Sequence, residues 1–133
     1  MTNEQSLEQF FHAWIRLLQG KPGWWVIRSV GRAADEMWRS PKFAALFNLP
    51  SSIYPWPERV RDLATGSVQK VEYYVSLSMK TGKAYSFTYK TRFQPHQDTS
   101  ALGSICYLAC PNCDRECGIL VGRVRLLDSP AAA

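Results

Sequence analysis

Residues 71–93 carry the most regular pattern in the sequence, and this pattern limits the fold more than any other feature. Apolar side chains alternate with polar ones in two successive runs, which are Val71, Tyr73, Val75, Leu77 and Met79 and then Tyr85, Phe87, Tyr89 and Phe93. Thr91 is the one polar residue on the apolar side of the second run. A period of two predicts two half-buried strands, with Thr81-Gly82 forming a tight hairpin turn between them. We therefore expect an antiparallel sheet.

The flanking segments predict helices around this sheet. Residues 3–19 are expected to form an amphipathic helix with one apolar stripe, made of Leu7, Phe10, Phe11, Trp14, Ile15, Leu17 and Leu18. Further strands are expected at residues 24–29, 36–39, 105–109 and 119–127. A helix is expected to begin at Pro41 with Ser40 as its cap, and a short helix to cover residues 58–65. Residues 51–57 and 94–103 are expected to be loops, so the chain is predicted to be an α+β domain.

Composition is that of one folded, moderately basic domain. The chain has 133 residues and a formal net charge of +5, with its basic residues scattered along the sequence. No apolar run reaches the length of about 18–20 residues that a membrane-spanning helix needs. No secretory signal is visible at the N-terminus, so we expect a cytoplasmic, reducing location.

Several short motifs, in order, resemble a PAS domain of the type common in bacterial sensors. Residues 24–29 resemble the opening strand with its Trp, and Gly31 the turn that follows it. The next matching positions are Trp38, Ser40, Pro41, Phe43, Leu46 and Phe47, and residues 71–85 resemble the long hairpin. The resemblance covers roughly residues 23–109. The His-Pro-Asp-Asp segment usual before the hairpin and the closing Asp-Ile-Thr are absent.

The resemblance implies an antiparallel five-stranded sheet with helices on one face, preceded by the N-terminal helix. It divides the chain into a helix at 1–22, a PAS-like domain at 23–128 and a disordered tail at 129–133. It implies a ligand pocket lined by the inward residues Phe43, Leu46, Phe47, Tyr73, Val75, Phe87 and Tyr89. The N-terminal helix is expected to pair two protomers, or to pack on the sheet, through Phe10, Phe11, Trp14 and Leu18. Flavin and haem are disfavoured because their motifs are missing.

All four cysteines lie in one segment, residues 106–117, which is not part of the general PAS pattern. Their spacing is Cys106-x3-Cys110-x2-Cys113-x3-Cys117. A Cys-x2-Cys knuckle lets two sulfurs reach one ion, so we expect a structural metal, zinc ahead of an iron–sulfur cluster. A redox thiol switch and unbound thiols remain open alternatives. If residues 105–110 are extended, Cys106 and Cys110 lie about 13 Å apart, and Cys106 joins the site only if the strand ends before Cys110.

These features predict a sensory or regulatory module rather than an enzyme. The only histidines are His12 and His96, and no nucleophile–base pair or Gly-rich phosphate loop can be argued from the spacing. The expected partners are a small ligand and either a second copy of the chain or a separate signalling protein. The alternatives are a Cys-based redox sensor and a metal-stapled module for protein or nucleic acid. In the latter, Lys80, Lys83, Lys90 and Arg92 would contact nucleic acid, which the scattered charges disfavour.

Overall fold

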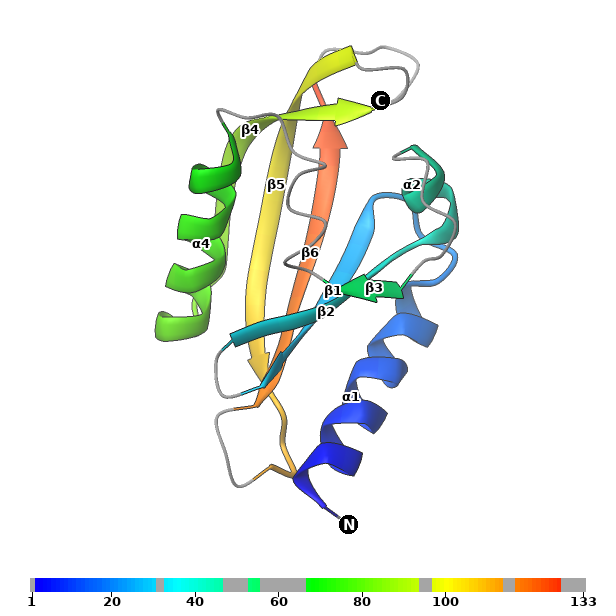
Figure 1. Cartoon of the computed structure of the whole chain (residues 1–133), viewed down its shortest axis with the longest axis vertical. Helices are drawn as coiled ribbons and strands as arrows, with labels where there is room; N and C mark the ends of the chain where they lie inside the picture. The colour runs from blue at the N-terminus through cyan, green and yellow to red at the C-terminus, as the bar shows by residue number, and fades with distance from the viewer. Residues whose placement is uncertain are drawn as a thin grey trace.

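A six-stranded antiparallel sheet forms the centre of the molecule, with the strand order β3-β2-β1-β6-β5-β4 (Figure 1). The structure is a computed structural model and describes residues 2–30, 33–46, 53–55, 67–93, 97–113 and 117–127. Five strands are long: β1 (Trp24–Val30), β2 (Ala33–Arg39), β4 (Tyr85–Phe93), β5 (Gln97–Ala109) and β6 (Gly118–Leu126). The sixth, β3 (Ile53–Pro55), adds three residues at one edge. The five long strands confirm the predicted α+β architecture.

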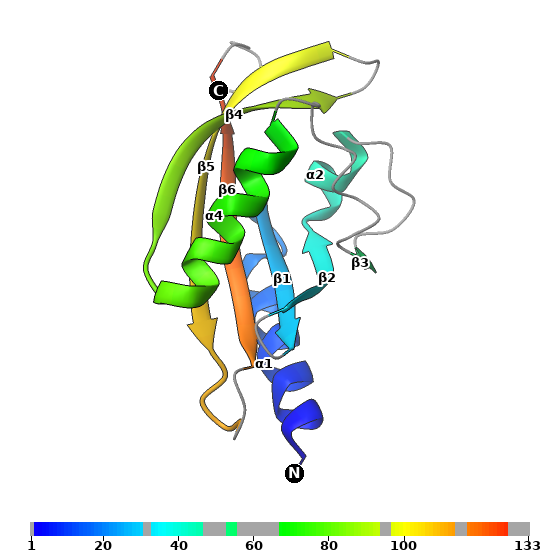
Figure 2. The ribbon, with the colours of Figure 1, turned by 60° about the vertical axis from the view of Figure 1, so that its left-hand side comes forward.

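Helices cover both faces of this sheet, and each face has its own core. Helix α4 (Val68–Thr81) lies on one face and α1 (Asn3–Leu18) on the other, as Figures 1 and 2 show. The short helix α2 (Pro41–Leu46) follows directly after β2. In β1, Trp25 and Ile27 belong to the α4 core, whereas Val26 belongs to the α1 core. The central strands are apolar on both sides because both sides are covered.

Helix α1 forms as the sequence predicts. A capping box closes its N-terminus: the Gln5 backbone N–H donates to Thr2 Oγ1 at 3.1 Å, and the Thr2 N–H donates to Gln5 Oε1 at 2.9 Å. Its buried apolar residues are Leu7, Phe11, Ile15 and Leu18. They pack on the sheet, so the apolar stripe is used within the chain.

The prediction of a strand at residues 71–80 is wrong, because this segment is helix α4. Val71, Val75 and Met79 are spaced by four residues, so they fit one helical face and the odd positions of a strand equally well. The intervening Tyr73 is 60% exposed, which a half-buried strand would not allow. Gly82 does adopt a positive φ of 69°, but it caps the helix, and its N–H donates to the Ser78 carbonyl at 2.8 Å.

Three loop or cap predictions also need correction. Strand β5 begins at Gln97 and pairs with β4 from Phe93 onward, so much of the loop expected at 94–103 is strand. Strand β3 lies inside the loop expected at 51–57. The Ser40 hydroxyl is buried with no hydrogen-bond partner among the described residues, so it does not cap α2. The helix expected at 58–65 and the tail at 129–133 lie outside the described residues.

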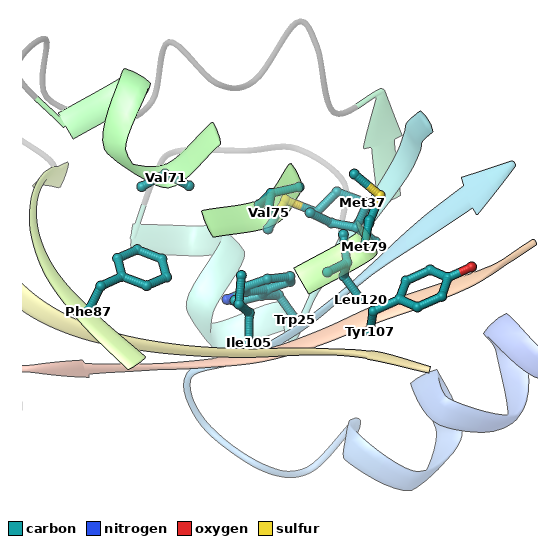
Figure 3. Close-up of a cluster of buried hydrophobic side chains, with 10 residues drawn as sticks. Trp25, Met37, Val71, Val75, Met79, Phe87, Ile105, Tyr107 and Leu120 are labelled. Carbon is teal, nitrogen blue, oxygen red and sulfur yellow. The ribbon is translucent and has the colours of Figure 1, made fainter. Parts of the chain in front are cut away.

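Two serine hydroxyls fasten α4 to the strands beneath it. Ser78 Oγ donates to the Lys83 carbonyl at 2.8 Å and accepts from the Tyr107 backbone N–H at 3.0 Å. Ser67 Oγ accepts from the Lys90 backbone N–H at 2.7 Å. Between these anchors the apolar face of α4 contacts the sheet, and Figure 3 shows Val71, Val75 and Met79 turned toward it.

The variant Ser78→Ala is expected to lower the free energy of unfolding by about 1–3 kcal/mol, because it leaves the buried Tyr107 N–H without its acceptor. Urea unfolding measures the change. Ser76→Ala on the exposed side of α4 is the matched control and should shift stability by less than about 0.5 kcal/mol. Equal effects from the two variants would contradict the anchoring role.

The variant Gly122→Ala is expected to cost about 1–3 kcal/mol or more, because the Trp25 ring lies directly against Gly122. A Cβ at Gly122 would stand 2.0 Å from Trp25 Cζ2, so the ring would have to move. The control is Gly20→Ala, where nothing lies within 4 Å of the added atom. Thermal unfolding of both variants tests this contact, and a Gly122→Ala protein as stable as the control would rule it out.

Candidate functional site

Aromatic rings fill the space between α4 and the sheet, which we call the interior. Tyr74 of α4 stacks on Phe87 of β4, with ring centroids 4.4 Å apart and planes at 4°. The next ring along β4, Tyr89, lies 5.7 Å from that of Phe87. Gly103 provides room for it, because a Cβ there would stand 3.0 Å from Tyr89 Cε1. The interior therefore contains several close-packed rings, with Gly103 beneath Tyr89.

Some of the predicted pocket residues lie in the interior, one is exposed to solvent, and the others lie outside what the structure describes. Val75 and Phe87 are buried in the interior core, and Tyr89 packs against that core partly buried. Tyr73 is wrongly assigned, because α4 turns it outward to solvent. The side chains of Phe43 and Leu46, and the whole of Phe47, lie outside what the structure describes. Contact with a ligand stays a prediction for the buried members of this set.

A buried cation lies in the same interior and was not predicted. Arg39, the last residue of β2, is only 3% exposed and pairs in register with Trp25 of β1. Loss of hydration raises the pKa of Tyr89 to about 12, while the positive charge of Arg39 acts in the opposite direction. Arg39 thus acts electrostatically on Tyr89 although their strands are not neighbours. The sequence signal was its position two residues after Met37, which places both on one face of the strand.

Thr91 adds a polar group to the β4 side of this interior. It follows Phe87 and Tyr89 at every second position, so the three share one face of β4. Its side chain is 1% exposed, and its Oγ1 has no hydrogen-bond partner among the described residues. A buried hydroxyl without a partner is costly, so a hydrogen-bonding group at this place would stabilise the protein.

The cysteines separate into a group of three and one outlier. Cys110 and Cys117 are buried in the α1 core, and Cys113 packs partly buried against that core. Loss of hydration and the neighbouring Cys110 and Cys117 thiols together raise the pKa of Cys113 to about 12. Cys106 lies earlier in β5, opposite Val121, and its thiol contacts the Tyr107 carbonyl at 3.7 Å. The structure therefore brings three of the four predicted ligands together.

These three thiols do not surround a metal position as their side chains lie. Within the described residues, no group of three or more His, Cys, Asp or Glu side chains is arranged to hold a metal ion. All four cysteines are free of disulfides.

The residues expected to form a dimer helix serve the α1 core. Phe11 and Leu18 are buried against the sheet, and Phe10 and Trp14 are partly buried against the same core. They are thus engaged within one chain, and pairing of two protomers through them stays a prediction. Of the residues expected to contact nucleic acid in the alternative interpretation, Lys80 lies on α4 rather than on a strand, and Lys90 Nζ donates to Ser100 Oγ at 2.6 Å.

Comparison with solved structures gives several matches to this architecture. The N-terminal domain of a diguanylate cyclase with a PAS/PAC sensor from Marinobacter aquaeolei superposes with a TM-score of 0.58 at 14% identity, covering 76% of this chain and 90% of that one. A sensory box histidine kinase/response regulator from Burkholderia thailandensis gives a TM-score of 0.58 at 12% identity, covering 85% of this chain and 83% of that one. The PAS domain of an HTR-like protein from Haloarcula marismortui superposes with a TM-score of 0.56 at 11% identity, covering 93% of this chain and 97% of that one.

The chain has a PAS fold. No protein-family model matches its sequence, and no curated protein matches it. The shared feature is therefore the architecture, which confirms the resemblance seen in the motifs. In the part of the chain that the structure describes, no helix has the length and apolar character needed to span a bilayer.

The burial of Tyr89 in the PAS interior predicts a late-ionising tyrosine. Because its folded pKa of about 12 lies above the ordinary value of 10.0, the fold favours the neutral phenol. The associated stability is present below about pH 10 and is lost as the pH rises through 12. An ultraviolet titration of tyrosinate should show a late step that Tyr89→Phe removes. The control Tyr73→Phe, at an exposed ring, should keep that step, and its loss there would contradict the assignment.

Proposed function

We propose that this PAS domain is a sensory or regulatory module whose interior binds a small, flat ligand carrying a carboxylate or similar anionic group. The observation that carries the proposal is Arg39, a buried cation in an aromatic interior. A guanidinium carries five N–H donors, so Arg39 can bind an anionic ligand group in addition to its contacts within the chain. The planar guanidinium pairs with a carboxylate through two parallel hydrogen bonds.

The other interior groups fit the remainder of such a ligand. The ring of Tyr89 can stack with a flat molecule, and it lies beside the Phe87 ring, which itself stacks on Tyr74. The Tyr89 phenol stays neutral at physiological pH and can donate or accept a hydrogen bond. The Thr91 hydroxyl lacks a partner among the described residues and supplies a further polar contact. A flat aromatic carboxylate matches this combination.

A binding role agrees better with these groups than catalysis does. Of the two histidines, His12 lies on α1, where its Nε2 is 3.3 Å from Glu8 Oε2, on the opposite face of the sheet from the interior. His96 lies outside the described residues. The names of two similarly folded proteins describe sensors, which supports the same role here. We expect the output to pass through dimerisation or a separate partner in the cytoplasm.

Thermal unfolding with benzoate and benzamide as probes tests the ligand class. Benzoate should raise the melting temperature of the wild type, because a ligand that binds only the folded state stabilises it, by about 2.7 kcal/mol at a hundred times Kd. Benzamide has the same ring without the charge and should give a smaller shift. Arg39→Gln should lose the benzoate shift, while Arg39→Lys should keep part of it.

Arg28→Gln is the matched control, because Arg28 pairs with Glu8 on the α1 face. Each shift is measured against the same variant without ligand, which separates binding from any change in basal stability. Equal shifts from benzoate and benzamide, or an unchanged benzoate shift in Arg39→Gln, would overturn the role of Arg39. Native mass spectrometry of the wild type gives a second readout of bound benzoate.

A further inference from the structure

The end of the β5–β6 hairpin brings two cysteines directly opposite each other. Ala109 and Gly118 form the last pair of the ladder, and the next residues are Cys110 and Cys117. The Cys110 N–H donates to the Cys117 carbonyl at 2.8 Å, which holds the two backbones together. Both side chains are buried in the α1 core, so they lie on the same face of the hairpin.

A turn then brings the third cysteine over this pair. The Cys113 N–H donates to the Cys110 carbonyl at 3.4 Å, across the turn made by Pro111 and Asn112. Cys113 packs, partly buried, against the core that contains Cys110 and Cys117. It also donates to the Asn3 carbonyl in the first turn of α1 at 3.5 Å. Three cysteines from one hairpin end thus lie close together beside the start of α1.

The fourth cysteine is too far back along the strand to join them. Cys106 lies within β5, which continues to Ala109, so its Cα is about 13 Å from that of Cys110. Ligand sulfurs around one zinc ion lie within about 4 Å of each other, given Zn–S bonds of about 2.3 Å. A site at the hairpin end therefore uses three sulfurs.

We propose that Cys110, Cys113 and Cys117 bind one thiophilic d10 cation, such as Zn²⁺, through three sulfurs, and that Cys106 is not a ligand. Each thiol gives its proton to solvent and its lone pair to the ion, so three thiolates with Zn²⁺ carry a net charge of −1. Three clustered thiolates would repel one another without a cation, and soft sulfur donors favour such ions. The backbone already brings the cysteines together, so the side chains have to converge on the ion by rotating about χ1.

The site would also fasten α1 to the hairpin. Cys113 contacts the first turn of α1 through Asn3, so fixing its sulfur fixes the position of that turn. The N-terminal end of a helix favours nearby negative charge, which suits the anionic cluster. This proposal concerns the α1 face of the sheet and does not depend on ligand binding in the interior.

The test is a zinc titration of the reduced full chain against a chromophoric chelator, together with a count of reactive thiols. The wild type should bind one Zn²⁺ per chain, and zinc should protect three of its four thiols from a disulfide reagent. The variant Cys106→Ser should bind zinc with unchanged affinity. Cys113→Ser should weaken binding by more than about 10–100-fold, the loss seen when only an outer-shell partner is removed.

Replacement by Co²⁺ gives a readout that does not rely on variants, because sulfur-to-cobalt charge-transfer absorption should grow in proportion to the bound ion. Four thiols that stay reactive with excess zinc would overturn the proposal. So would a loss of binding in Cys106→Ser, which would require all four cysteines. Equal zinc affinity in wild type and Cys113→Ser would identify adventitious binding only. If two thiols fail to react with the reagent in the absence of metal, and react again after treatment with a reductant, a disulfide pair is indicated instead.

Discussion

The pairing of β1 with β6 is the contact on which the rest of the structure depends. It joins the first strand of the fold to the last, with Trp24 opposite Arg123 and Trp25 opposite Gly122. At that second pair the indole lies where a Cβ would otherwise stand, so the absence of a side chain at Gly122 allows the ring to rest on the sheet. The same two strands present Val26 and Val121 to α1 on the other face. One strand pair therefore supports both cores, and everything that lines the interior is placed relative to the Trp25 ring.

Much of this architecture follows from local patterns in the sequence. The main error, a strand predicted where helix α4 lies, has a definite physical cause. The stripe of α1 has only helical periodicity, so it could be predicted with its boundaries nearly correct. Residues 71–81 satisfy two periods at once, because Val71, Val75 and Met79 are both four apart and all odd-numbered. Tyr73 favours the strand by its alternation, whereas Ser78, buried and bonded to Tyr107 across the fold, fits only the helix. That bond joins residues far apart in the sequence, so local reasoning could not detect it.

The site was predictable to the extent that its chemistry depends on spacing. The cysteine spacing correctly indicated a cluster, and the distance argument already raised the doubt about Cys106. Strand β5 continues to Ala109 and keeps Cys106 away from the hairpin end, and a strand boundary is set by pairing with β6 rather than by the residues at the boundary. Arg39 was missed because its role, unlike that of the cysteines, has no signature in the spacing of residues. A single arginine in a strand has no motif, and its burial becomes visible only when β2 is placed beside β1 and the interior closes over it.

The β5–β6 hairpin is the physical connection between the two faces of the sheet. Helix α4 is fastened to it at the Tyr107 N–H, three residues before Cys110, and the hairpin end touches α1 through Cys113. The Ser78 contact to Tyr107 and the Cys113 contact to Asn3 thus belong to one continuously paired hairpin, so a ligand that displaced α4 would act on the element that also contacts α1. Coupling between sites also needs an element with two arrangements. Helix α1 is the element suited to that part, because side-chain packing, the ion pair of Glu8 with Arg28 and one thiol–carbonyl contact hold it, and no backbone ladder among the described residues does. A cation bound by the three thiols would then set how readily α1 responds.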